Sequence, residues 1–347
     1  MQSSALHRSL VSGAFVVAVC VGGLSSVRAD SQVVQAVAIG APEVVVAPAA
    51  AITGEVDDAT LEAALADAGV DLPEGSSVYA VRIDHTGAGT AYEAGEGADY
   101  TGFWPASSVK LLAAVGALEY LSDLGFTGKA RITMGGETFT VADVYEAAIA
   151  DSSNEAYDQL VRIAGVDWLN EEFLTSANGF ADTVIQRSYT GWGVNVSPAM
   201  TIVEQGRRLT IPPREATGSY GCDDDGNCST LLELTESVRR VTLDAEVPEE
   251  ERFDIAAEDI AGLTEALLSA EGFVEPAVSE VLGGETLVYN KPGYVPGDEC
   301  VDIALLTDEA AGLRYLLAVE TPEDGWLCPG LVEVAAATLH FLKQSDA

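Results

Sequence analysis

The sequence has few basic residues for its length. Its 347 residues include 17 lysines and arginines but 55 aspartates and glutamates, which gives a formal net charge of −38 at pH 7. A surface of that charge repels phosphate backbones and anionic lipid, so a nucleic-acid partner is excluded. Solubility in a salty environment explains the charge better than a specific basic ligand does.

Histidine is scarcer still, with three residues. His7 lies near the N-terminus, His85 in a predicted hairpin turn and His340 in a predicted helix near the C-terminus. A Ser-His-Asp triad needs a histidine beside its serine, and the chain has no Gly-x-Ser-x-Gly elbow. Zinc also lacks ligands, and the acidic loop 223–227 does not have the spacing of an EF-hand calcium loop. We therefore expect neither a metal nor a cofactor.

Residues 1–29 have the pattern of an export signal. Arg8 precedes an apolar run, Leu10–Leu24, and a small-residue cleavage site ends at Ala29. A membrane-anchoring helix is the alternative, but the run is short for a span and is interrupted by glycines. We therefore predict a secreted or periplasmic protein that has no stable membrane insertion once the signal is removed.

Export determines how the five cysteines are interpreted. Cys20 leaves with the signal, so an even number remains in an oxidising compartment. Cys222 and Cys228 enclose a short loop, while Cys300 opens one predicted strand and Cys328 follows the end of the next. An antiparallel hairpin brings those two ends together, so the predicted disulfides are Cys222–Cys228 and Cys300–Cys328.

The order of predicted elements defines the fold class. Residues 30–56 are rich in Ala, Val and Pro without an amphipathic period, which indicates a linker, and residues 57–347 form the folded domain. Two strands come first, helices follow, and three strands and a helix come last. This order predicts an α/β domain, an α+β sandwich whose antiparallel sheet is built from both chain ends and carries a helical subdomain. We expect a monomer. The predicted strands are 77–83, 90–94, 285–290, 301–307 and 313–320, and the predicted helices are 58–68, 111–121, 141–150, 156–163, 166–175, 198–209, 229–243, 256–270 and 331–342.

One short motif places a hydroxyl beside an amine. Ser107 precedes Lys110 by three residues at the start of a predicted helix, and residues at that spacing lie on the same face. A neutral lysine there could accept the serine proton and make the hydroxyl a nucleophile. The chain has only four lysines, and no other has a serine three residues before it.

Two further motifs follow in the chain. Ser152-Ser153-Asn154 lies between two predicted helices, and Lys291-Pro292-Gly293 lies at the end of a predicted strand. Each motif alone is also explained as a helix cap, a solvated residue or a turn, and the Ser-x-Asn pattern recurs at Ser176-Ala177-Asn178. Two of the four lysines, Lys110 of the first motif and Lys291 of the third, fall in the three motifs, and mutual repulsion in one cleft would lower their pKa values.

The three motifs together resemble the signature of the serine β-lactamase and penicillin-binding protein superfamily: Ser-x-x-Lys, Ser-x-Asn and Lys-Thr/Ser-Gly. From Asp57 to the C-terminus the chain is similar to the class A β-lactamase-like branch, since the order of helices and strands also fits its α/β sandwich. The resemblance implies that Ser107 is the acylated nucleophile and Lys110 its base. It also implies that Ser152 passes a proton to the leaving nitrogen.

The same resemblance implies a substrate-binding set. Asn154 would bind the side-chain amide of the substrate, and Lys291 would attract a substrate carboxylate. Gly293 completes the third motif. The oxyanion hole would consist of the backbone N–H groups of Ser107 and Tyr294.

Two positions depart from the family pattern. Class A enzymes carry a glutamate that activates the deacylating water, in a loop between the second and third motifs. If Arg187 matches the arginine before it and residues 197–200 match the end of the loop, the loop is short and Tyr189 falls at the place of the glutamate. No acid lies between Arg187 and Met200. Pro292 replaces the family's Thr or Ser, so a hydroxyl that helps to hold the substrate carboxylate is absent.

These observations predict an exported serine hydrolase that acts through a Ser107 acyl-enzyme on a carboxylate-bearing amide such as a β-lactam. The substrate would be a small molecule or derived from peptidoglycan. The alternatives are a D-Ala-D-Ala carboxypeptidase or esterase of the same fold, or a non-catalytic protein that binds penicillin or peptidoglycan.

Overall fold

The computed structural model describes residues 58–84, 87–191, 193–222, 226–308 and 312–344, which lie in one compact unit. The predicted signal peptide and linker, and the predicted acidic loop at 223–225, lie outside the described residues. Within the described ranges, no helix is both long enough and apolar enough to cross a membrane.

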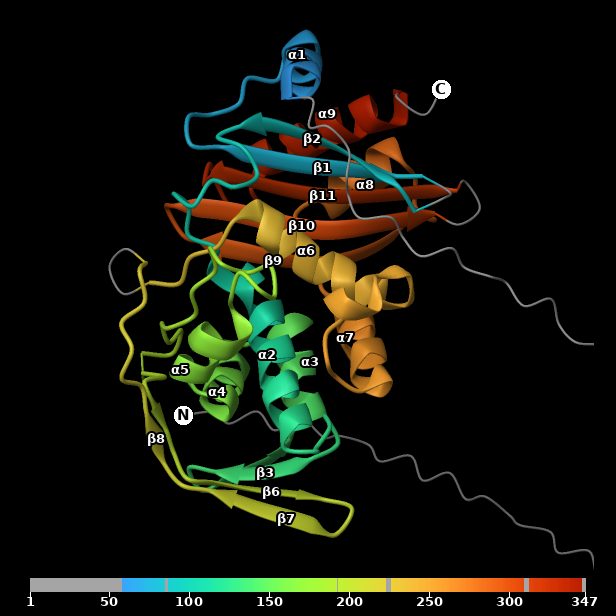
Figure 1. The fold of residues 1–347 in the computed structure, drawn as a ribbon. Helices are drawn as coiled ribbons and strands as arrows, with labels where there is room; N and C mark the ends of the chain where they lie inside the picture. Colours follow the sequence, from blue (N-terminus) through green and yellow to red (C-terminus); the bar gives the residue numbers. More distant parts are fainter. Residues whose placement is uncertain (1–57, 85–86, 192, 223–225, 309–311, 345–347) are drawn as a thin grey trace, which may run out of the picture. The chain divides into compact units, whose positions relative to one another are not determined.

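A five-stranded antiparallel sheet is assembled from both ends of the chain, as the sequence predicts (Figure 1). Its strand order is β2-β1-β11-β10-β9, so the two N-terminal strands lie beside the three C-terminal ones. The β1–β11 pairing joins the two ends, with Ser77 opposite Glu320. The strands are β1 (Ser77–Ile83), β2 (Gly89–Gly95), β9 (Leu287–Val295), β10 (Glu299–Asp308) and β11 (Leu313–Pro322).

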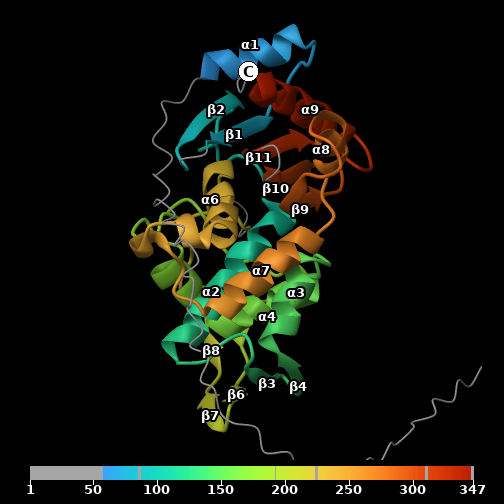
Figure 2. The same ribbon diagram turned by 90° about the vertical axis from the view of Figure 1, so that its right-hand side faces the viewer.

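Alternating side chains give the sheet two apolar faces, because successive residues of a strand point to opposite sides. On β1, Val78 and Ala80 belong to one core cluster and Tyr79 and Val81 to the other. The first cluster is covered by three helices near the chain ends, which lie along one side of the sheet in Figure 2. These helices are α1 (Asp58–Asp67), α8 (Glu275–Val281) and α9 (Pro329–Gln344).

The second face packs against the helical subdomain. Its central helix is α2, and the ten residues buried along it confirm the prediction of a buried helix after the first motif. Short 3-10 turns at Asp244–Glu246 and Glu249–Glu251 follow α6. The subdomain helices are α2 (Lys110–Asp123), α3 (Val141–Ile149), α4 (Asn154–Ala164), α5 (Val166–Trp168) with a π-helical turn at Leu169–Phe173, α6 (Leu231–Thr242) and α7 (Ala257–Ser269).

The predicted helix at 198–209 is wrong. This segment is a hairpin of β6 (Met200–Glu204) and β7 (Arg207–Ile211), which joins β3 (Arg131–Met134) and β4 (Glu137–Thr140) in a four-stranded sheet of order β4-β3-β6-β7. Neither β3 nor β4 was predicted from the sequence.

The hairpin has a local cause. Gln205 and Gly206, between the two strands, have φ values of +48° and +84°. Positive φ at both positions is the backbone of a two-residue turn that fits strand twist. The β-branched run Thr201-Ile202-Val203 favours a strand, so it outweighs the helix-start pattern at Ser197-Pro198.

Both predicted disulfides are confirmed, Cys222–Cys228 and Cys300–Cys328. The second bond joins the start of β10 to the residue before α9, and both of its cysteines are buried. It therefore ties the sheet to the helix that covers it.

Loss of the second disulfide should reduce stability more than loss of the first. The sequence separation is 28 for Cys300–Cys328 and 6 for Cys222–Cys228, and a cross-link restricts the unfolded chain more when its loop is longer. We expect the double variant Cys300→Ala/Cys328→Ala to lose about 3.5 kcal/mol of unfolding free energy, against about 2 kcal/mol for Cys222→Ala/Cys228→Ala. Urea denaturation measures both; a larger loss in the second variant would contradict the expectation.

Candidate active site

The first motif lies on a tight turn before α2. Residues Ala106–Val109 form a 3-10 helix, and the Lys110 N–H donates to the Ser107 carbonyl, which closes the turn between the two motif residues. Ala106 has a φ of +48°, an uncommon conformation for a residue with a Cβ atom. Ser107 is half-buried, whereas Lys110 is fully buried. The turn thus keeps the serine reachable and the lysine enclosed.

Gly293 lets strand β9 approach this turn closely. A Cβ atom at this position would lie 2.7 Å from the Pro105 carbonyl oxygen and 3.2 Å from the Ser107 nitrogen. Any side chain would therefore push the strand away from the turn that carries Ser107. The side chain of the next residue, Tyr294, packs edge-on against Trp326 with ring centroids 5.7 Å apart, so only its backbone suits the predicted oxyanion role.

The three motifs meet at Ser152. Its hydroxyl lies 3.3 Å from the Lys110 Nζ and 3.0 Å from the Lys291 Nζ, and both contacts are hydrogen bonds. Lys110 also donates to the Ser152 carbonyl at 2.5 Å and to Asn154 Oδ1 at 2.7 Å. Ser153 begins α4 by accepting the Ala156 N–H, which fixes the loop that carries Ser152.

Both lysines have lowered pKa values, and burial is the largest cause for each. Burial lowers the pKa of Lys110 from 10.5 to about 8, although Asp158 and Glu155 raise it. Burial lowers the pKa of Lys291 to about 7, with a further contribution from the charge of Lys110. Repulsion between the lysines is therefore a secondary cause, and it acts on Lys291. A neutral amine is accessible at both positions near neutral pH.

A buried carboxyl group lies behind Lys291. Asp302 on β10 pairs across from Pro292 on β9 and accepts the N–H groups of Phe273 at 2.6 Å and Val274 at 3.0 Å. Burial raises the pKa of Asp302 to about 7, against the lowering effect of those hydrogen bonds and of Lys291. In turn, Asp302 raises the pKa of Lys291.

Asp158 on α4 organises the loop that faces Lys110. This carboxylate, 1% exposed, accepts hydrogen bonds from Ser188 Oγ at 2.6 Å, the Tyr189 N–H at 2.9 Å, and Thr190 Oγ1 at 2.5 Å. Asp158 was not predicted from the sequence, although Asp158 follows Asn154 by four residues and therefore lies on the same face of the helix. Its role is to position the loop.

Tyr189 covers the buried side of the first motif. Its ring stacks on Tyr157 with centroids 4.5 Å apart, and its hydroxyl donates to the Ala106 carbonyl. The Lys110 Nζ lies 5.7 Å from the centre of the Tyr189 ring. An aromatic ring thus lies next to the lysine.

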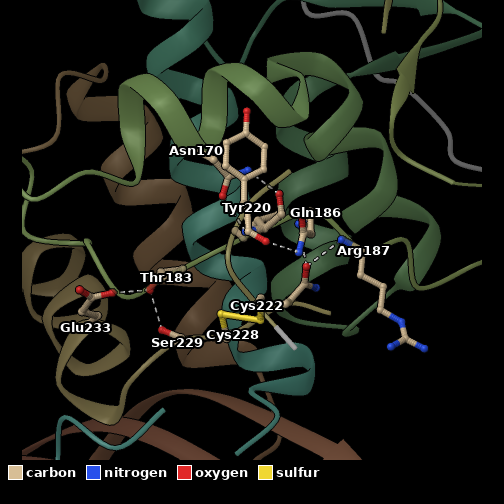
Figure 3. The surroundings of a disulfide bond; sticks show 11 residues. Asn170, Thr183, Gln186, Arg187, Tyr220, Cys222, Cys228, Ser229 and Glu233 are labelled. Atoms are coloured by element: carbon tan, nitrogen blue, oxygen red, sulfur yellow. Dashed lines mark hydrogen bonds between the residues drawn. A yellow bond between two sulfur atoms is a disulfide. The ribbon is translucent and has the colours of Figure 1, made fainter. Parts of the chain in front are cut away.

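Backbone and side-chain hydrogen bonds join the two ends of this loop. Val184 pairs with Cys228 in an antiparallel bridge, and Asn227 Oδ1 accepts the N–H groups of Gln186 and Arg187, each at 2.9 Å. Figure 3 shows Gln186 and Arg187, with hydrogen bonds drawn as dashed lines, beside the Cys222–Cys228 disulfide. Residues 184–187 and 227–228 are therefore held side by side.

The predicted end of the loop, at 197–200, is wrong. From β5 (Val196–Ser197) the chain continues into the β6–β7 hairpin and returns through β8 (Arg214–Glu215), so the loop extends to Cys228 and is long. The β6–β7 hairpin is thus an insertion in the loop, and the pairing of β5 with β8 closes its base. The sequence pattern did not predict this pairing.

The inserted segment supplies no acid to Lys110 among its described residues. Its two described acids are Glu204 and Glu215. Glu204 accepts hydrogen bonds from Thr127, and Glu215 lines a separate cavity that includes Trp168. Tyr189 remains the side chain of this loop that lies against the lysine.

Comparison with known sequences gives no match: no protein-family model matches the chain, and no curated protein does. Solved structures do match. PBP-A is 15% identical with a TM-score of 0.58, covering 84% of this chain and 97% of its own. A class A β-lactamase from Mycobacterium abscessus is 19% identical with a TM-score of 0.55, covering 83% of this chain and 98% of its own. The extended-spectrum β-lactamase TLA-3 is 13% identical with a TM-score of 0.58, covering 82% and 99%.

These likenesses show the fold. The chain has the β-lactamase and transpeptidase-like fold of class A β-lactamases and of the penicillin-binding protein PBP-A, as the sequence motifs predicted. A mutant of PBP-A has been solved as an acyl-enzyme complex with penicillin G.

Removal of the Asp158 carboxylate should release the loop. In Asp158→Ala, half-buried donors at 188–190 lose their buried acceptor, so we expect the Tyr189 and Thr190 amides to exchange roughly tenfold faster and the unfolding free energy to fall by about 3 kcal/mol. Hydrogen–deuterium exchange with mass spectrometry measures the first effect. The control is Glu155→Gln, an exposed residue of the same helix, which should leave exchange unchanged. Equal exchange in Asp158→Ala and the native protein would refute this role.

Proposed function

We propose that the chain is a serine hydrolase that forms an acyl-enzyme on Ser107. The observation that carries this proposal is the meeting of two buried lysine amines on the Ser152 hydroxyl, beside the turn that holds Ser107. Burying an ammonium group without a charged partner costs free energy of folding. A purely structural role therefore does not account for two such lysines side by side.

In the proposed reaction, neutral Lys110 accepts the Ser107 proton while Ser107 Oγ attacks the substrate carbonyl. The carbonyl oxygen becomes an oxyanion, which the backbone N–H groups of Ser107 and Tyr294 stabilise. Ser152 then donates its proton to the leaving atom as the carbonyl–leaving-group bond breaks, and it regains a proton from Lys110. The product is an ester on Ser107 and a released, or ring-opened, leaving group.

Release of the acyl group is proposed to be slow. Hydrolysis of the ester needs a base that activates water, and Tyr189 rather than a carboxylate lies against Lys110. Acylation without efficient release favours the behaviour of a penicillin-binding protein over that of an efficient β-lactamase. The substrate class is an amide or ester carbonyl, β-lactams and D-amino-acid peptides of peptidoglycan included.

Export is part of the proposal. Two disulfides need an oxidising compartment to persist, and this agrees with the signal-peptide pattern of residues 1–29. A secreted or periplasmic location would also bring the chain to peptidoglycan-derived substrates.

A penicillin should label Ser107. After incubation with benzylpenicillin or its methyl ester, we expect a covalent adduct that peptide mapping by mass spectrometry places on Ser107. The adduct should be absent in Ser107→Ala and retained in Ser108→Ala, because the Ser108 hydroxyl donates to the Pro105 carbonyl at 2.5 Å within the turn.

The lifetime of the adduct tests the second half of the proposal. Persistence over hours fits slow release, and rapid loss with accumulation of hydrolysed penicillin would show an efficient β-lactamase instead. If neither an adduct nor hydrolysis of any ester or D-Ala-D-Ala peptide were found, the chain would be a non-catalytic binding protein.

Acylation should depend on the protonation of Lys110. The pKa of Lys110 is lowered to about 8, and only the neutral amine accepts a proton. With the uncharged methyl ester of benzylpenicillin, the acylation rate should rise about tenfold per pH unit below pH 8 and level off above it. Lys110→Arg, charged throughout, should be slower by roughly 10²–10⁴ at every pH. A flat profile in the native protein would rule out Lys110 as the base.

A further inference from the structure

A cavity of about 420 Å³ opens beside Ser152 and Lys291. We refer to it as the leaving-group cavity, because in the proposed mechanism Ser152 donates its proton to the leaving atom. Its walls come from the α3–α4 loop, the end of α7 and strand β9. The lining residues are Ile149, Ala150, Asp151, Ser152, Ser269, Glu271, Lys291 and Pro292.

Two carboxylates from different elements line this cavity. Asp151 follows α3 and Glu271 follows α7, and both residues are exposed. Lys291 is the one cationic side chain among the lining residues, and it is 1% exposed. Its Nζ donates to Ser152 Oγ at 3.0 Å and to the Pro292 carbonyl at 3.1 Å, so two of its hydrogen bonds stay within the protein.

Pro292 and Ser269 offer no free donor to an anion. Pro292 has no hydroxyl, and the Ser269 hydroxyl donates to the Glu265 carbonyl at 2.9 Å. Burial favours the neutral form of Lys291, whose pKa is about 7. A carboxylate in this cavity would therefore meet two like charges in its lining and a single amine that is partly neutral.

We propose that Asp151 and Glu271 select a substrate whose leaving group carries a positive charge. A protonated amine or quaternary ammonium group in the leaving-group cavity is attracted by both carboxylates, whereas a carboxylate is repelled. This inference rests on the proposed function, and it replaces the predicted pairing of Lys291 with a substrate carboxylate by selection of the opposite charge.

Three penicillins that share one acyl side chain and one ring system test the charge preference. They are benzylpenicillin, its methyl ester and its diethylaminoethyl ester, with charges of −1, 0 and +1 at the varied group. We expect acylation of Ser107, followed by mass spectrometry, to be fastest for the cationic ester and slowest for the carboxylate, with at least about a tenfold difference. In 1 M salt the difference should shrink, because exposed charges are screened.

The double variant Asp151→Asn/Glu271→Gln separates charge selection from the intrinsic reactivity of the three compounds. Its cationic-to-anionic rate ratio should fall by about fivefold or more relative to the native protein. The control Glu280→Gln, an exposed residue of α8 outside the cavity, should leave the ratio unchanged.

Two results overturn the inference: benzylpenicillin as the fastest of the three, or a rate ratio that the double variant does not change. Failure of the proposed function has a different outcome, since then none of the three compounds would modify Ser107. Circular dichroism of the double variant confirms folding, because both substituted side chains are exposed.

Discussion

The site depends on two buried amines that share one hydroxyl. The hydrogen bonds of Lys110 and Lys291 go to neutral oxygen acceptors: Ser152, Asn154 and the Pro292 carbonyl. Without a directly bonded carboxylate, burial favours the neutral amine, which is the form that can accept a proton. Ser152 takes a φ of +53° where it meets both lysines, so the backbone adopts an uncommon conformation to bring the three groups together.

Most of the fold was predictable from periodicity, because the sheet and the helices bury regular apolar patterns. Alternation indicated β1, strand-like runs indicated the three C-terminal strands, and the order of elements predicted a sheet built from both ends. The hairpin of β6 and β7 was not predicted, since Ser197-Pro198 has the pattern of a helix start. The hairpin is indicated instead by the Gln205-Gly206 turn and by the β-branched residues within the two strands. This turn depends on the backbone conformation of two residues.

The candidate site was predictable only as far as short motifs reach. The motifs identified Lys110, Ser152, Asn154 and Lys291, and in the fold Lys110 donates to Ser152 and Asn154 while Lys291 donates to Ser152. The loop opposite them was not predictable, because the bridge that closes it joins residues 184 and 228 across an inserted hairpin. Its anchoring carboxylate, Asp158, is recognisable only once the loop is in place, since its partners come from 30 to 32 residues further along the chain.

Tyr189 contacts both the turn that carries Ser107 and the amine of Lys110. Its hydroxyl holds the Ala106 carbonyl, and Ala106 is the residue with a φ of +48° immediately before Ser107. Gly293 brings β9 against the same turn. The turn is therefore held by two elements, and one of the contacts comes from the residue whose ring lies against Lys110. A smaller side chain at 189 would open space for water there, but it would also free the backbone that presents Ser107. In the proposed mechanism, one side chain would therefore both hold the turn that carries Ser107 and occupy the space beside Lys110, which would favour acylation over release.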